Sequence, residues 1–162
     1  MVELKILEKF TSKCKKKITL NSQGDQTVDY IVQYFNKFIE LLNQYPSSKL
    51  TFLEVPVYSI KGYNKSTDDN LNQEYKTLDK ELERQIFVLN GHIRHLNTQL
   101  NTSSPNFSIH LKVSSKRRTR SRAETVHYFN YSLYSDGIHP KQNLALVWLR
   151  EISERIKTDC WS

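Results

Sequence analysis

An aspartate and a histidine near the end of the chain have the types and the spacing of a hydrolytic pair. Asp136 and His139 stand three residues apart within the turn-forming segment 135–140, which holds a glycine and a proline. At this spacing the carboxylate can contact one imidazole nitrogen and leave the other nitrogen free to take a proton. The plainer alternative is that the aspartate caps the turn or the next helix and the histidine is a surface residue. If the pair is catalytic, the chain supplies the histidine and the aspartate of a Ser-His-Asp triad, and only the serine is missing.

Few serines are suited to be the missing nucleophile. Ser12 stands beside a lysine and a cysteine in no recognised turn, and Ser135 is next to Asp136, too close for the geometry of a triad. Ser22 follows a short apolar stretch that could end a strand, so it is the candidate that we retain. An acyl transfer needs a hydroxyl within hydrogen-bond reach of the histidine. We therefore expect this chain alone to be inactive, although His139 could activate water for slow hydrolysis.

A second candidate site is electrostatic. Five basic residues fall within seven positions and a run of rings follows: Lys116, Arg117, Arg118, Arg120 and Arg122, then His127, Tyr128, Phe129, Tyr131 and Tyr134. Arginines bind phosphates and aromatic rings stack on unpaired bases, so this interleaving suits single-stranded nucleic acid. The alternative is a solvated basic loop or a nuclear-import signal, with the tyrosines in the core. The net charge of +7 agrees with an anionic partner, but it also serves solubility.

No pattern in the sequence indicates a metal or a cofactor. His92 and His95 stand one helical turn apart, which is more typical of a solvated helix face than of a metal site. Cys14 and Cys160 lie near opposite ends, in no metal-like spacing. We find neither a signal peptide nor an apolar stretch that could cross a membrane. We expect no cofactor, no metal, no membrane contact and an intracellular location, cytoplasmic or nuclear.

The elements that must position these residues alternate between helical and extended patterns. Apolar spacing predicts helices over 27–42, 68–101 and 144–156, and extended segments over 18–20, 50–57 and 106–113. Such alternation with short connections favours a parallel sheet covered by helices. We expect one domain over 18–162, preceded by a basic arm or short helix over 1–17. The helix over 68–101 is long enough to support self-association, although a kink near Gly91 would also explain its length.

The segment Asp136-Gly137-Ile138-His139-Pro140, placed before a final helix, resembles the last conserved block of the SGNH (GDSL-like) hydrolases. This superfamily consists of three-layer α/β/α esterases and lipases. Two earlier stretches, Glu54-Val55-Pro56-Val57 and Ile86–Ile93, are loosely similar to the same family, so the resemblance spans roughly residues 18–157. It implies a short, mostly parallel sheet between helices, and hydrolysis of an acyl ester in which Asp136 and His139 are two members of the triad.

The family's nucleophile block has no counterpart in this chain. No Gly-Asp-Ser occurs, and the turn at Gly24 continues with aspartate and glutamine. That turn resembles instead the family's later Gly-x-Asn-Asp block, which implies an oxyanion role for Gly24 and for Asn21, the nearest asparagine. The chain is thus expected to be a truncated or degenerate SGNH-like domain. The alternative is a nucleic-acid-binding module of regulatory or mobile-element origin.

Overall fold

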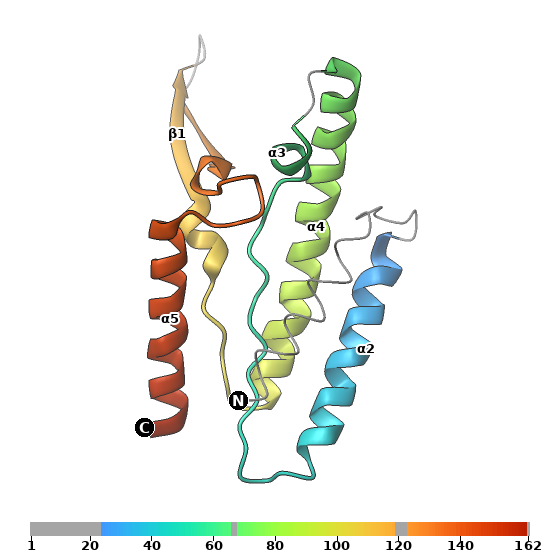
Figure 1. Cartoon of the computed structure of the whole chain (residues 1–162), viewed down its shortest axis with the longest axis vertical. Helices are drawn as coiled ribbons and strands as arrows, with labels where there is room; N and C mark the ends of the chain where they lie inside the picture. The colour runs from blue at the N-terminus through green and yellow to red at the C-terminus, as the bar shows by residue number, and fades with distance from the viewer. Residues whose placement is uncertain (1–23, 66–67, 119–122, 162) are drawn as a thin grey trace.

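The computed structural model describes residues 24–65, 68–118 and 123–161 (Figure 1). The basic arm over 1–17, the extended segment expected over 18–20 and the candidates Asn21, Ser22, Arg120 and Arg122 lie outside these ranges. The backbone of Arg117 and Arg118 is described, but their side chains are not.

Helices dominate the described part of the chain. They are α2 (Gly24–Leu42), α3 (Ile60–Asn64), α4 (Asp69–Gln99) and α5 (Gln142–Trp161), with short 3-10 helices η1 (Phe107–Leu111) and η2 (Tyr131–Leu133). The sheet there consists of one antiparallel hairpin, in which β1 (Lys112–Arg118) pairs with β2 (Ala123–Phe129). The expected three-layer α/β/α fold with a mostly parallel sheet is therefore wrong. Its expected central strands do not pair with one another.

The segment 50–57, expected as a strand, runs stretched along α4 without pairing to a described strand (Figure 1). Two asparagines of α4 bond its backbone instead. The Asn97 amide accepts from Phe52 N at 2.9 Å and donates to Phe52 O at 2.7 Å. Asn90 does the same with Val55, at 2.8 Å in both directions. Seven helical residues rise about 10.5 Å and three extended residues span about 10 Å, so the two spacings match.

The other side of the same segment is bonded by residues that follow α4. Glu54 N donates to Ser104 Oγ at 2.7 Å, and Val57 N donates to Ser108 Oγ at 3.1 Å. The hydroxyl of Tyr134 donates to Val57 O at 2.6 Å. Because side chains on both sides satisfy the backbone, the segment is extended and half-buried without a neighbouring strand.

The second expected strand, over 106–113, divides into η1 and the start of β1. Phe107 and Leu111 are both buried, whereas Ile109 between them is 59% exposed. A strand would place these alternate side chains on one face, but a tight helical turn separates Ile109 from its neighbours. The period-two pattern therefore predicted the wrong element here.

The three helices expected from apolar spacing are confirmed as α2, α4 and α5. Asp68 caps α4 by accepting from Asn70 N at 2.8 Å, and the helix continues through Gly91 without a break. Its apolar residues enter two core clusters. One cluster is Val57, Ile60, Leu82, Ile86, Leu111, Tyr134 and Leu144, and the other is Val28, Phe52, Leu89, Ile93 and Leu96. The chain itself thus covers the apolar stripe of α4 from Leu82 to Leu96, while Leu71 near its start is 39% exposed, and self-association through this helix stays a prediction.

Candidate functional sites

The structure brings Asp136 and His139 together in the turn before α5. Asp136 Oδ2 lies 2.6 Å from His139 Nδ1, while Oδ1 accepts from the backbone N–H groups of His139 at 2.8 Å and Ile138 at 3.1 Å. The bonds from His139, backbone first and side chain second, lower the pKa of Asp136 to about 2. One carboxylate thus caps the turn and orients the imidazole at the same time, so the two alternatives for this pair coexist.

Gly137 fixes this turn against α3. Its φ is 87°, in the left-handed region that favours glycine, and a Cβ there would lie 2.6 Å from Tyr63 N and 2.7 Å from Ser59 O. Its carbonyl accepts from Ser59 N at 2.9 Å. Neither the conformation nor the space admits another residue, so the backbone next to Asp136 and His139 is held rigidly.

The nucleophile does not appear beside this pair in the described part of the chain. The side chain of His139 is 70% exposed, and its hydrogen bond to Asp136 uses Nδ1, so Nε2 is not engaged by that carboxylate. Ser135 Oγ donates to the carbonyl of His139 at 3.1 Å rather than approaching the ring. Gly24 is the first residue of α2, and Figure 1 shows α4 between that helix and the turn. The oxyanion role implied for Gly24 therefore has no geometric support.

The β1–β2 hairpin displays basic residues along one face. Strand alternation and the observed register place Lys112, Ser114 and Lys116 on the face that also holds Phe129, His127 and Thr125. Both lysines are exposed. Ser114 Oγ lies 2.8 Å from His127 Nδ1, which fixes the imidazole and leaves Nε2 open. The backbone continues through Arg117 and Arg118 to the end of β1.

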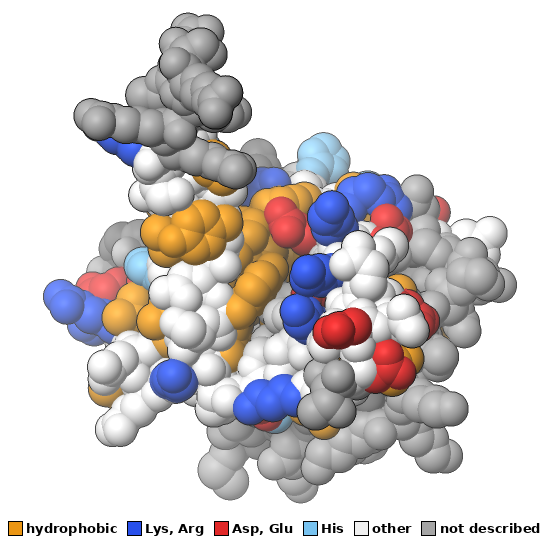
Figure 2. All heavy atoms as spheres, turned by 90° about the horizontal axis from the view of Figure 1, so that it is seen from above, with side chains coloured by type: hydrophobic (Ala, Val, Ile, Leu, Met, Phe, Trp, Pro, Cys, Tyr) orange, Lys and Arg blue, Asp and Glu red, His pale blue; other side chains and the backbone are white. Residues whose placement is uncertain are grey.

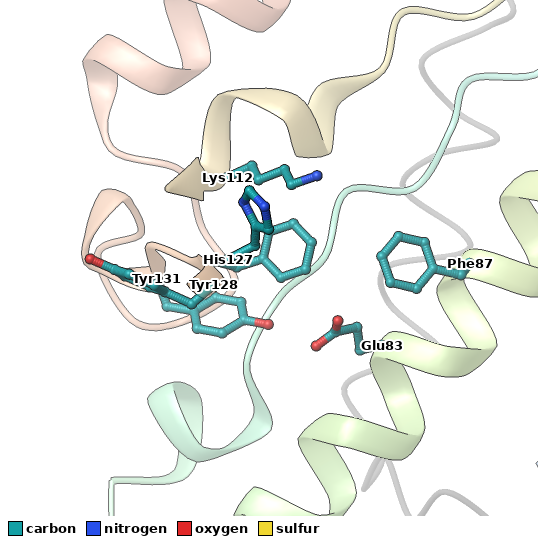
Figure 3. Close-up of a pocket in the computed structure, with 7 residues that line it drawn as sticks. Glu83, Phe87, Lys112, His127, Tyr128 and Tyr131 are labelled. Carbon is teal, nitrogen blue, oxygen red and sulfur yellow. The ribbon is translucent and has the colours of Figure 1, made fainter. Parts of the chain in front are cut away.

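A cavity of about 450 Å³ separates the base of this hairpin from α4. Aromatic rings form much of its wall: the centroid of Phe129 lies 6.2 Å from that of Phe87 and 6.4 Å from that of Tyr131. Figure 3 shows Glu83 and Phe87 on α4, facing the hairpin residues across the opening. Figure 2, seen from above, shows hydrophobic side chains gathered in a hollow, with basic and acidic side chains around it. The lining residues are Glu83, Phe87, Lys112, His127, Tyr128, Phe129 and Tyr131.

Glu83 is the acidic group of this cavity. Among the described residues its carboxylate has no hydrogen-bond or ion-pair partner, and partial burial followed by the charge of Asp79 raises its pKa. Burial, followed by the charges of Glu83 and Asp79, also raises the pKa of the Tyr131 phenol, which stays a neutral donor. The sequence indicated the hairpin residues but missed Glu83 and Phe87. The signal that the sequence offered was Phe87, a large apolar residue that lies off the buried stripe of α4. In the structure its side chain is 47% exposed.

A second histidine–carboxylate pair joins η1 to α5. His110 Nε2 lies 2.7 Å from Glu151 Oε1, and Glu151 lines another cavity, of about 430 Å³, beside α5. The expectation that His92 and His95 do not form a metal site stays a prediction. In the described ranges no group of three or more histidine, cysteine or acidic side chains is arranged to hold a metal ion. None of the described helices is long and apolar enough to span a membrane.

Comparison with known proteins yields no relative. No family model matches the chain, and neither a curated protein nor a solved structure matches it. The resemblance to the SGNH hydrolases therefore stays a prediction that rests on the segment 136–140. Nucleic-acid contact likewise rests on the residues of the hairpin and of the cavity beside it.

Proposed function

We propose that the chain binds single-stranded nucleic acid with the β1–β2 hairpin and the cavity at its base. The supporting observation is continuity: the exposed lysines of β1 lead directly to a cavity walled by aromatic rings. Cations bind phosphates, and flat apolar faces stack on bases. Lys112 serves both parts of this surface, because it starts the basic strand and also lines the cavity.

Single strands fit this surface better than a duplex does. In a duplex each base is stacked between its neighbours, so its faces are not available to Phe87, Tyr128 or Tyr131. Single strands present unstacked bases that can enter an aromatic pocket while the backbone stays on the basic strand. If the chain contacted phosphates alone, it would bind single strands and duplexes equally well. A preference for single strands therefore distinguishes binding through bases from binding through phosphates.

The test is a salt titration of binding to a fluorescent single-stranded oligonucleotide, followed by anisotropy. We expect the double variant Lys112→Ala/Lys116→Ala to bind more weakly and to lower the salt slope by about 1.4, at roughly 0.7 per phosphate contact. The matched control is Lys37→Ala/Lys157→Ala, which removes the same charge from α2 and α5. Equal losses in the two double variants would mean that only the net charge matters. No binding at low salt would overturn the proposal.

A second candidate function is ester hydrolysis assisted by His139. It is favoured by the 2.6 Å contact that orients the imidazole while its other nitrogen faces solvent. In this reaction Nε2 takes a proton from water as the oxygen attacks the acyl carbon. The imidazolium then returns this proton to the leaving oxygen as the ester bond breaks, which gives an acid and an alcohol. A hydroxyl from Ser22, outside the described residues, would replace the water if the reaction proceeds through an acyl-enzyme.

Hydrolysis of p-nitrophenyl acetate tests this candidate if generic imidazole catalysis is subtracted. His92→Ala is the matched control, because His92 is an exposed histidine on α4 with no carboxylate partner in the described chain. We expect His139→Ala to remove turnover and Asp136→Asn to reduce it, while His92→Ala leaves it unchanged. Equal losses in the two histidine variants would reject a specialised role for His139. Ser22→Ala then distinguishes water from serine as the attacking group.

A further inference from the structure

The two opposite walls of the cavity beside the hairpin carry side chains of opposite charge. Lys112 and His127 come from the hairpin, Glu83 comes from α4 on the opposite side, and aromatic rings lie around the space between them (Figure 3). A nucleotide has the same three parts in the same order: an anionic phosphate, a flat base and a polar base edge. The arrangement therefore fits one nucleotide lying across the cavity from the hairpin to α4.

The carboxylate of Glu83 is an acceptor that lacks a donor. It is partly buried, and no described residue donates a hydrogen bond to it. Its oxygens stay accessible to water, so a ligand that enters the cavity has to replace that water with donors of its own. An ionised carboxylate has only acceptors, on two oxygens, so the complementary ligand presents two adjacent donors.

Resting on the proposed function, we propose that this cavity accepts one unpaired guanine base, with Glu83 reading its edge. Guanine is the base whose Watson–Crick edge carries two adjacent donors, N1–H and the N2 amine, and these can bond to the two carboxylate oxygens. Adenine and cytosine place an acceptor beside their amine, and uracil has a single donor between two acceptors. A carboxylate would meet a lone pair on each of those three edges.

A quaternary or methylated ammonium ion is the other ligand that aromatic rings and a carboxylate attract. The hairpin side of the cavity argues against it. Lys112 is a cation on that wall, and among the described residues it has no ion-pair partner that would neutralise it. A cationic ligand would be repelled there, whereas a phosphate next to the base would be attracted.

The experiment compares oligouridine nonamers that carry one central guanosine, inosine, adenosine or cytidine, with all-uridine as reference. Inosine keeps N1–H but lacks the N2 amine. We expect the guanosine oligomer to bind roughly ten-fold tighter than all-uridine or more, with inosine between them, since a bidentate pair discriminates by this order. Glu83→Gln should bring guanosine close to uridine without lowering uridine binding. The control Glu74→Gln, at an exposed glutamate of the same helix, should keep the preference.

The outcomes separate this inference from the function on which it rests. Uridine binding without a guanosine preference overturns the guanine pocket and leaves single-strand binding intact. Absence of binding to every oligomer overturns both. If choline changes the tyrosine fluorescence while no oligomer binds, the cavity belongs to a cationic ligand and the inference is wrong. Phe87→Leu is a second variant, at a half-exposed position that should still fold, and it should weaken the guanosine oligomer most strongly by removing a ring.

Discussion

Two asparagines and one glutamate of α4 differ in how their polar atoms are bonded. Toward the C-terminal end Asn90 and Asn97 are 3% and 1% exposed, and both ends of each amide are bonded to the extended segment. In the N-terminal half Glu83 lines a cavity, and its carboxylate has no partner among the described residues. A buried amide with both ends bonded holds the fold, whereas a partly exposed carboxylate with no protein donor is free to bond a ligand that enters the cavity beside it.

The largest effect expected from this comparison is at Asn97. Asn97→Ala leaves both the N–H and the C=O of Phe52 buried without partners, and we expect it to reduce the free energy of unfolding by about 3 kcal/mol or more. Urea denaturation followed by circular dichroism measures this loss. Gln99→Ala, at an exposed position of the same helix, is the control and should change little. Similar values for the two variants would show that the asparagine contacts do not hold the extended segment.

Unlike Asn97→Ala, the variant Glu83→Gln should not lower the stability of the fold. The raised pKa of Glu83 means that the folded state disfavours the ionised form, so this group contributes most to stability at acid pH. That contribution is lost as the pH rises through the folded pKa. At pH 7 we therefore expect Glu83→Gln to be at least as stable as the parent chain, while nucleotide preference is lost. A clear loss of stability at pH 7 would mean that the carboxylate has a structural role.

The smallest effect is expected at Asp136, whose bonds are satisfied at an exposed turn. Its pKa of about 2 lies below the ordinary 3.8, so its contribution to stability is present above about pH 3.8 and disappears as the pH falls through 2. Asp136→Asn should remove this acid dependence. Carboxyl NMR should give the low pKa directly, and His139→Ala should raise it only part of the way, because the backbone bonds remain. A full return to 3.8 would assign the whole shift to the imidazole.

Apolar periodicity was sufficient to predict the three long helices, although α5 buries only Leu144 of its apolar stripe, whereas α4 buries a continuous run of such residues. It failed for the sheet because the backbone partners of the segment 50–57 are side chains. Asn90, Asn97, Ser104 and Ser108 donate or accept where a neighbouring strand would have done so. A pattern of alternating residues reports burial, and it does not report what bonds to the backbone between them.

The candidate sites also differ in how far they could be predicted from the sequence. The contact between Asp136 and His139 could be anticipated because three residues of one turn separate them. The cavity could not, since Glu83 and Phe87 precede His127 by 40 residues or more and meet the hairpin only through the packing around α4. The pair formed by His110 and Glu151 is a further example, with a separation of 41 residues. Chemistry assembled from distant elements leaves no local spacing to recognise.

The matched spacing of α4 and the extended segment has a consequence for how this chain can vary in length. One residue inserted between Phe52 and Val55 would shift one end of the segment by about 3.4 Å. Two residues inserted between Asn90 and Asn97 would lengthen the helix by about 3 Å and so compensate for that shift. They would also rotate one asparagine by about 200° around the helix axis, so that its amide would point away from the extended segment. We therefore expect the two stretches to tolerate substitution at their exposed positions but neither insertion nor deletion, and we expect the connections outside them to accept changes in length.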